Sequence, residues 1–298
     1  MAIGESNSAG YEHLIVPQNW ADFTKTDHGT WQILYERQME LIAPHVCSEY
    51  LVSLDRLGFS AKQIPNLQEL NDRLRPLTGW EIVTTEGLVK GKPFFAMLAD
   101  RKFPTGNFIR DRSELFYISE PDLVHDLLGH APLFSNPAYA NYMHEYGKGG
   151  ERAIKYKTTK HLARCNWWSI EYGVLREGDE IKFYGAGLCS SYGEADYFIN
   201  DPSAHIIEFD LERAMRTRVY ICDLQPIYMC IPSFEWLFEA AVNTDFSPMY
   251  ERFKGLGDHE QAEEYLPFDL QPGDEVIREG TQEYINPKRE ELTASLSI

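Results

Sequence analysis

The sequence lacks the marks of a nucleic-acid-binding or membrane-spanning protein. Basic residues are scarce, because 28 Lys and Arg stand against 46 Asp and Glu and give a formal net charge of −18. A protein that binds phosphate backbones needs a basic patch, so this balance argues against a nucleic-acid partner. There is no run of about eighteen apolar residues, and we expect no transmembrane helix and no membrane partner. The first ten residues lack the basic and apolar regions of a secretory signal, so we expect a cytoplasmic protein.

Two common kinds of binding motif are also absent. The Gly185-Ala-Gly187 segment lacks the third glycine of a dinucleotide-binding turn and the Lys-Ser/Thr pair of a phosphate loop. The cysteines form no Cys-x-x-Cys pair, which argues against a zinc finger. Their odd number, without a secretory context, predicts reduced thiols. The five are Cys47, Cys165, Cys189, Cys222 and Cys230.

The hydrophobic pattern predicts a mainly α-helical domain with a few short strands. The chain has 298 residues, 43% of them hydrophobic, and no low-complexity linker divides it. Helical periodicity predicts helices from a cap at Asp27 to Pro44, from His45, from Leu67, over 162–175 and over 233–242, with a short helix at 92–99. Strands are expected over 80–85, 180–184 and 217–222, and a glycine-bearing loop over 185–194.

The most informative segment is Pro121 to Pro132, which holds His125 and His130 five positions apart. Nine histidines in this length predict about 0.3 such pairs by chance, so the spacing alone decides little. On a straight α-helix the two side chains would lie about 140° apart, too far for easy chelation. Gly129 and Pro132 allow the helix to end there and bring His130 back toward His125. A helix with two ordinary histidines is the alternative.

A third candidate ligand is Glu171. On the helix predicted over 162–175 it shares a face with Arg164, Trp168 and Leu175. A carboxylate among bulky apolar side chains is costly unless it meets a cation or a metal. The alternative is a solvated helical glutamate.

These three residues fit more than one metal. Two histidines and one carboxylate match the facial triad of non-haem Fe(II) oxygenases. A catalytic zinc site of two histidines and one glutamate looks similar, although zinc hydrolases usually place both histidines on one helical face with a base glutamate between them. Asp126 directly follows His125, at the position of that base. The residues alone leave both metals open.

Several motifs, in order, resemble the pterin-dependent aromatic amino acid hydroxylases, especially their single-domain bacterial members. The likeness runs over about residues 15 to 245 and rests on segments 73–80, 103–110, 120–130, 167–173, 184–191 and 215–218. It implies one catalytic domain over 13–269, while the composition predicts a disordered segment over 1–12 and a polar C-terminal extension over 270–298. It also implies a monomer that uses Fe(II), tetrahydrobiopterin or a related pterin, and O2 to convert L-phenylalanine to L-tyrosine.

The resemblance also assigns roles to residues. It makes His125, His130 and Glu171 the iron ligands. It places the substrate among Arg110, which grips the α-carboxylate, Tyr117, Pro121, Trp167, Gly187 and Ser190. It places the pterin among Gly87, Leu88, Val89, Phe94 as stacking partner, Asp126, Leu162 and Ala163.

Three positions depart from the family pattern. Asp126 stands for the usual Glu, Asn166 for a common Tyr, and Ile118 for the Thr of the animal enzymes. The ring position attacked, or the aromatic substrate, could therefore differ, with tryptophan as the main rival. Two alternatives from other classes are a zinc hydrolase and a sensor of aromatic amino acids without catalysis.

Overall fold

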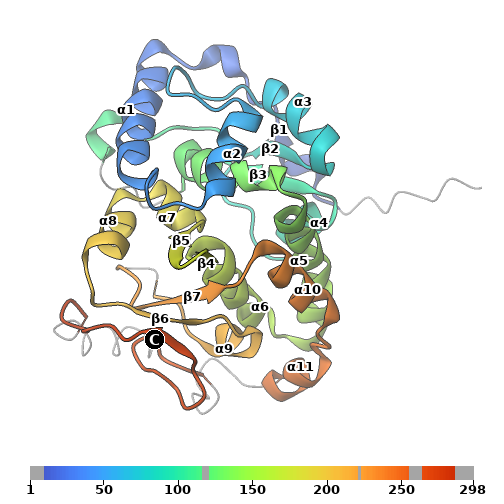
Figure 1. Cartoon of the computed structure of the whole chain (residues 1–298). Helices are drawn as coiled ribbons and strands as arrows, with labels where there is room; N and C mark the ends of the chain where they lie inside the picture. The colour runs from blue at the N-terminus through green and yellow to red at the C-terminus, as the bar shows by residue number, and fades with distance from the viewer. Residues whose placement is uncertain (1–9, 116–120, 221–222, 255–263, 286–298) are drawn as a thin grey trace, which may run out of the picture.

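The computed structural model describes residues 10–115, 121–220, 223–254 and 264–285, and it confirms the mainly helical class (Figure 1). Two segments, η4 (Val124–His130) and η6 (Trp167–Glu171), are π-helices, and η5 (Pro132–Ser135) is a short 3-10 helix. The α-helices of the described ranges are α1 (Lys25–Ile42), α2 (Ser48–Leu57), α3 (Leu67–Thr78), α4 (Lys92–Ala99), α5 (Pro137–Tyr156), α6 (Thr159–Asn166), α7 (Ala186–Ser190), α8 (Tyr192–Asn200), α9 (Leu211–Arg216), α10 (Phe234–Asn243) and α11 (Ser247–Phe253).

The strands form two small sheets, which Figure 1 shows in different halves of the molecule. One sheet has the order β1-β2-β3, with β1 antiparallel and β3 parallel to β2. The other has the order β5-β4-β7-β6-β8. Their bounds are β1 (Ile15–Val16), β2 (Glu81–Thr85), β3 (Lys102–Thr105), β4 (Val174–Glu177), β5 (Glu180–Phe183), β6 (His205–Glu208), β7 (Ile227–Ile231) and β8 (Val276–Arg278).

Several elements begin or end differently from the sequence prediction. Thr24 caps helix α1, in place of the predicted Asp27. Asp27 is the third helical residue, and its carboxylate accepts a hydrogen bond from the backbone amide of Thr24, which completes a capping box. The segment predicted as a helix over 162–175 becomes α6, then η6, then β4. The predicted loop after Gly185 contains α7 and α8, and Thr217 makes only an isolated bridge, to Tyr265, in place of a strand.

Helix α5 organises the interior, because α4, α6 and α10 all pack against it. Close approach to α4 depends on Gly147: a Cβ atom there would lie 2.5 Å from the backbone nitrogen of Ala99 and 2.7 Å from the carbonyl carbon of Leu98. The largest core side chains, among them Trp31, Trp80 and Trp168, are completely buried. The elements that carry the candidate ligands thus rest on a closely packed core.

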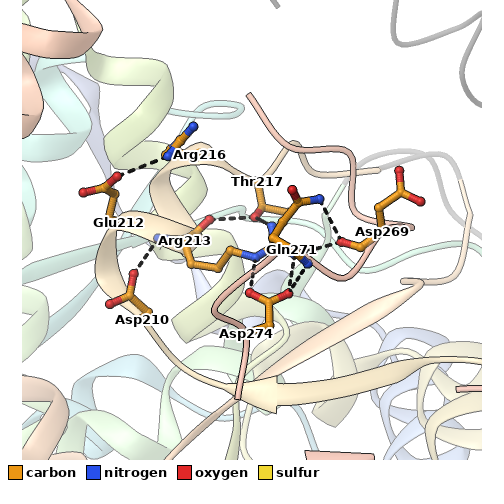
Figure 2. Close-up of polar contacts among 8 residues, drawn as sticks. All are labelled: Asp210, Glu212, Arg213, Arg216, Thr217, Asp269, Gln271 and Asp274. Atoms are coloured by element: carbon orange, nitrogen blue, oxygen red, sulfur yellow. Dashed lines mark hydrogen bonds and ion pairs between the residues drawn. The ribbon is translucent and has the colours of Figure 1, made fainter. Parts of the chain in front are cut away.

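The segment 264–285 lies against α9, and Figure 2 shows the polar contacts that hold it there. Arg213 donates from Nε to Asp274 Oδ1 (2.8 Å) and from Nη2 to the carbonyl of Asp269 (3.0 Å). The Arg213 and Asp274 side chains are only 6% and 5% exposed. Beyond Asp274 the chain forms β8, which pairs with β6. This part of the expected C-terminal extension is therefore built into the larger sheet.

The remaining expectations about the chain concern its ends and its thiols. Residues 1–9 and 286–298 lie outside the described ranges, whereas Tyr11 is 3% exposed and donates a hydrogen bond to Asp100 (2.6 Å). Within the described ranges, no helix has both the length and the apolar character that crossing a bilayer requires. Four cysteines are buried and free, as predicted, and Cys222 lies outside the described residues.

Candidate metal centre and substrate site

Metal-binding atoms of His125, His130 and Glu171 converge on one point. The two histidine Nε2 atoms lie 3.2 Å apart. The Glu171 oxygens lie 3.6 Å from Nε2 of His125 and 3.3 Å from Nε2 of His130. The three ligand atoms are all within 4.8 Å of one another. Two imidazoles and a carboxylate in this arrangement suit one metal ion, with further coordination positions left for other ligands.

Both ligand-bearing segments are π-helical, which corrects the predicted helix end at Gly129. A π-turn closes by a hydrogen bond between residues five apart, so such residues stand one turn apart on about the same side. The amide of Ala131 donates to the carbonyl of Asp126 (3.1 Å), and the amide of Tyr172 donates to that of Trp167 (2.9 Å). The five-residue spacing of the histidines is therefore the spacing that this turn requires.

Gly129 serves packing instead of chain termination. A Cβ atom at this position would lie 2.8 Å from the carbonyl oxygen of Ala186, so only glycine lets η4 approach α7 this closely. Helix α7 is the element that carries Ser190 toward the histidines. The sequence also singles out Gly129, but as a residue that allows the helix to end.

Ser190 fixes the orientation of the His125 ring. Its Oγ lies 2.9 Å from His125 Nδ1 and donates to the carbonyl of Ala186 at 2.7 Å. Because the hydroxyl proton is donated to that carbonyl, Ser190 Oγ accepts a hydrogen bond from the N–H group at Nδ1, and Nε2 of His125 keeps its lone pair. This is the tautomer that a metal ion at Nε2 needs.

Glu171 is nearly buried, at 9% exposure. Burial acts to raise its pKa, but the facing imidazoles of His125 and His130 outweigh burial, and the net shift of the Glu171 pKa is downward. Buried Nδ1 of His130 has no hydrogen-bond partner among the described residues. A carboxylate that ionises readily beside two imidazoles is the donor set expected for a divalent cation.

Asp126 is turned toward β3 and the turn after it. Its Oδ2 accepts from the amide of Gly106 (2.8 Å) and from the hydroxyl of Thr105 (3.0 Å). Burial raises the pKa of Asp126 in spite of these bonds. This shorter carboxylate is thus fixed by the protein, next in sequence to a candidate ligand.

Arg110 makes a two-point ion pair with Asp122. Its Nε and Nη2 donate to Oδ2 and Oδ1 of Asp122, each at 2.8 Å, and the side chains are 10% and 0% exposed. Oδ1 of Asp122 also accepts from the amide of His125 (3.3 Å). Nη1 of Arg110 makes no hydrogen bond to the part of the chain that the structure describes. One edge of the guanidinium is therefore committed to the protein, and the other remains for a ligand.

The remaining substrate residues of the prediction lie on three segments. Gly187 of α7 is close to the candidate ligand, because a Cβ there would lie 3.0 Å from Glu171 Oε1. The Trp167 ring is half-buried and stacks on Tyr172, with centroids 5.9 Å apart and planes at 20°. Pro121 is exposed just before η4. Tyr117 and Ile118 lie outside the described residues.

The residues assigned to the pterin lie on the loop after β2, on α4 and on α6. Gly87 has a φ of 73° and Leu88 is 64% exposed, so this loop offers apolar surface to a ligand. Phe94 of α4 is half-buried and meets Phe95 edge to face at 6.2 Å. The others are half-buried or buried: Val89, Ala163 and Leu162.

Two residues of this region were missed by the sequence analysis. Asp122 is a fully buried acid that holds both Arg110 and the start of η4. Tyr172 packs against the Trp167 ring. The sequence marks both, since Asp122 stands three residues before His125 and Tyr172 directly follows Glu171, but their contacts depend on the fold.

Comparison with known proteins gives consistent matches along the chain. Residues 11–252 match the family described as "Biopterin-dependent aromatic amino acid hydroxylase". The phenylalanine-4-hydroxylase of Caulobacter vibrioides is 40% identical, over 90% of this chain and 89% of that protein. That of Chromobacterium violaceum is 38% identical, over 94% of this chain and 92% of that protein. The crystal structure of C. violaceum phenylalanine hydroxylase bound to cobalt has a TM-score of 0.84 at 37% identity, over 89% and 93% of the two chains.

Proposed function

Since the chain belongs to the biopterin-dependent aromatic amino acid hydroxylases, we propose that it hydroxylates L-phenylalanine to L-tyrosine with O2. Its cofactors are iron(II) and a tetrahydropterin, as family membership implies. The substrate is inferred from the relatives, which are named phenylalanine-4-hydroxylase. The observation that carries the proposal is the convergence of His125, His130 and Glu171 within 4.8 Å.

We assign the iron to His125, His130 and Glu171, whose donor atoms fit a non-haem iron site. Iron and tetrahydropterin together supply the activation of O2, which no amino acid side chain provides. The protein's part is to fix the three ligands, exclude water and anchor the amino acid. Ser190 contributes by holding the His125 ring, as its 2.9 Å contact indicates.

The substrate's α-carboxylate is assigned to the free edge of Arg110. Asp122 already neutralises the guanidinium and holds it rigid, so a substrate carboxylate meets a fixed, pre-oriented donor at Nη1. Binding to a preorganised group costs less side-chain entropy than binding to a mobile arginine. The Asp122 charge also weakens the pull on a second carboxylate, so this contact orients the substrate more than it adds affinity.

The aromatic ring of the substrate is assigned to the space beside Trp167, with Pro121, Gly187 and Ser190 around it. The absence of a side chain at Gly187 leaves room next to Glu171, where the ring must approach the metal. The bulk of Trp167 favours phenylalanine over an indole. Tyr117 is assigned to the same pocket by resemblance alone.

We assign the pterin to the loop 87–89, Phe94 and the α6 residues Leu162 and Ala163, with Asp126 close to the metal. Stacking of a flat heterocycle on the Phe94 ring is the main contact. Because Asp126 is held by Gly106 and Thr105, its role is to shape the pterin side of the metal centre from a fixed position.

One assay tests the activity. The protein is loaded with Fe(II) without oxygen, then mixed with tetrahydropterin, O2 and either phenylalanine, tryptophan or tyrosine, and each product is identified by mass and retention time. We expect tyrosine from phenylalanine at the highest kcat/KM. A product hydroxylated at another ring carbon, or a higher kcat/KM for tryptophan, would contradict the proposed substrate and leave the family assignment intact.

The control for the metal uses the same preparation. Protein loaded with Zn(II), and protein with Glu171→Ala loaded with Fe(II), should both form no tyrosine. Activity of the Zn(II) form without pterin would instead support the hydrolase alternative.

A further inference from the structure

Helix α6 carries two of the residues assigned to the pterin, Leu162 and Ala163, but its first turn has little stabilisation of its own. Thr158 at the N-cap makes no side-chain hydrogen bond to the helix, and the first turn holds no acidic residue. Lys160 instead places a positive charge near the positive end of the helix dipole, which is unfavourable. The position of this turn therefore depends on groups outside the helix.

The negative charge that α6 lacks comes from Glu264, in the segment that lies against α9. Its Oε1 forms ion pairs with Lys160 Nζ, at 3.1 Å, and with Arg164 Nη1, at 3.0 Å. Its Oε2 accepts a hydrogen bond from Arg218 Nε at 2.6 Å. We call Lys160, Arg164, Arg218 and Glu264 the Glu264 cluster. Because Lys160 and Arg164 stand one turn apart on α6, one carboxylate spans that turn and joins it to the chain just after α9.

The Glu264 cluster is mostly withdrawn from water. The Glu264 side chain is 4% exposed, and those of Arg164 and Arg218 are 14% and 11% exposed. Burial acts to raise the pKa of Glu264, but the facing cations outweigh burial and lower this pKa to about 2. The carboxylate is therefore charged near neutral pH. Removing that charge would leave three neighbouring cations that repel one another.

Leu162 lies on the opposite face of α6 from the Glu264 cluster. It stands two positions from both Lys160 and Arg164, which places it about 160° from each around an α-helix. Leu162 is 5% exposed and lies beside α5, where a Cβ atom at Gly149 would be 3.9 Å from its Cδ2. Helix α6 packs against both α5 and α9 (Figure 1). A displacement of the face that Glu264 holds would therefore move Leu162 and Ala163 as well, because they belong to the same turn.

We propose that Glu264 holds α6 in the position that the pterin requires, and so acts as a positioning residue of the cofactor site. This inference rests on the proposed function, because it uses the assignment of Leu162 and Ala163 to the pterin. Glu264 acts through α6 and need not touch the pterin. It lies beyond residue 252, where the match to the family ends.

The test measures the Kd of tetrahydrobiopterin by calorimetry without oxygen, for the Co(II)-loaded protein, in which no turnover occurs. Glu264→Gln keeps the shape of the side chain and removes its charge. We expect the Kd to rise about three- to tenfold, the effect of losing about one methylene-sized contact. In turnover assays of the Fe(II) form, the KM for the pterin should rise by a similar factor, while kcat and the KM for phenylalanine change little.

A second variant tests whether the charge left behind is the cause. Lys160→Gln in the Glu264→Gln background removes one of the repelling cations, so it should restore part of the pterin affinity. In the wild-type background the same change removes one ion pair and should raise the Kd about two- to threefold. If Glu264→Gln fails to fold, Lys160→Gln still gives a test, because the Lys160 side chain is 30% exposed. A wild-type Kd in that variant would then overturn the proposal.

Asp274→Asn is the matched control. Asp274 belongs to the same segment and makes an equally buried ion pair, with Arg213 of α9, that does not include a residue of α6. Metal content and Tm are measured for every variant. We expect Asp274→Asn to lower the Tm, as Glu264→Gln does, and to keep the wild-type Kd for the pterin. A wild-type Kd in folded Glu264→Gln would overturn the proposal, as would an equal rise of the Kd in Asp274→Asn.

Calorimetry also separates this inference from the proposed function, since it requires no turnover. If the wild-type enzyme binds the pterin but forms no tyrosine, and Glu264→Gln raises the Kd, the proposed function fails and the positioning role stands. If turnover is normal and Glu264→Gln binds the pterin as wild type does, the positioning role fails alone. Wild-type protein that binds no pterin would overturn both.

Discussion

Single residues behind the ligands control the candidate metal centre. Ser190 orients His125 from α7, and Asp122 holds both Arg110 and the backbone of His125. Removing such a partner commonly lowers the metal affinity about ten- to a hundredfold. The ligands are therefore best understood together with these contacts.

We expect Ser190→Ala to weaken iron binding by about ten- to a hundredfold, because His125 Nδ1 loses its acceptor and the ring loses its fixed tautomer. The measurement is iron retained after dialysis against a graded chelator, followed by activity with excess Fe(II), which should recover. Ser191→Ala is the control, since its hydroxyl caps α8 and does not reach His125. Equal iron retention in both variants would refute this role.

Arg110→Ala should destabilise the protein as well as impair substrate binding. Its removal leaves the carboxylate of Asp122, which is 0% exposed, without a counter-charge. Breaking a buried ion pair by deleting one partner costs about 3 to 5 kcal/mol. Urea denaturation measures the loss, and Arg110→Lys, which keeps the charge but not the two-point contact, should lose less. An Arg110→Ala protein as stable as wild type would show that the pair is dispensable.

For single residues, the sequence predicts a role where the chemical type and the spacing of the side chains indicate one. The histidine pair and Glu171 can be found because imidazoles and a carboxylate in apolar surroundings imply a metal. The pairing of Arg110 with Asp122 cannot, because it depends on which of many acids meets that arginine after folding. The role of Arg110 as a substrate anchor was implied only by the resemblance to the hydroxylases, which gives no indication of its structural role.

Among the elements, the contact of α4 with α5 shows how packing positions the pterin side of the site. Helix α4 carries Phe94, and its last turn lies on the backbone of α5 at Gly147. Gly149 is on the same helix, but a Cβ there would meet only Leu162, at 3.9 Å. Gly147 therefore has no room for a larger side chain, whereas Gly149 has room for one.

We expect Gly147→Ala to cost about 1 to 3 kcal/mol in unfolding free energy, because the added Cβ meets the backbone of α4 and overpacks the interface. Gly149→Ala should be neutral or stabilising by up to about 1 kcal/mol, since alanine favours a helix and the contact is ordinary. Thermal and urea unfolding of the two proteins measure the difference. Equal stability would mean that α4 can shift freely, in which case the KM for pterin should rise in Gly147→Ala.

The two π-turns could not be predicted from the sequence. A periodicity of 3.6 residues predicts an α-helix through both ligand segments, and the actual hydrogen bonds from Ala131 to Asp126 and from Tyr172 to Trp167 follow no local propensity. Helices α1 to α4, α10 and strand β5 were predicted because their apolar patterns are regular, whereas α5, the helix that organises the interior, was not predicted. The built-in segment before residue 286 was not, because its polar composition gives no sign of the Arg213–Asp274 ion pair.

For the whole molecule, buried ionisable groups decide how stability depends on pH. His161 is 1% exposed, stacks on Phe253 at 4.4 Å, and has its pKa lowered from 6.5 to about 4 by burial and by nearby Arg164 and Lys160. Between these values the unfolded chain binds a proton at this residue that the folded protein does not. Stability from this group is present above pH 6.5 and is lost as the pH falls toward 4.

We expect wild-type protein to lose up to about 3 kcal/mol more unfolding free energy than His161→Phe as the pH falls from 7 to 4. Phenylalanine keeps the stacking on Phe253 and removes the titration. Glu194 acts in the opposite direction, since its pKa is raised to about 7 and its contribution falls as the pH rises from 4.5 to 7. Comparing the two proteins at each pH isolates His161, and parallel curves would show that it does not contribute.

The π-turn at η4 shows that the number of residues between two histidines decides which kind of helical turn can bring them to one metal ion. Four residues separate His125 from His130, and a turn closed over five positions brings the two rings together. Deleting one of these residues would leave the histidines four apart, the spacing with which an ordinary α-helix presents the paired histidines of zinc hydrolases. In this segment, the deletion of one residue therefore separates a histidine pair suited to a π-turn from one suited to an α-helix.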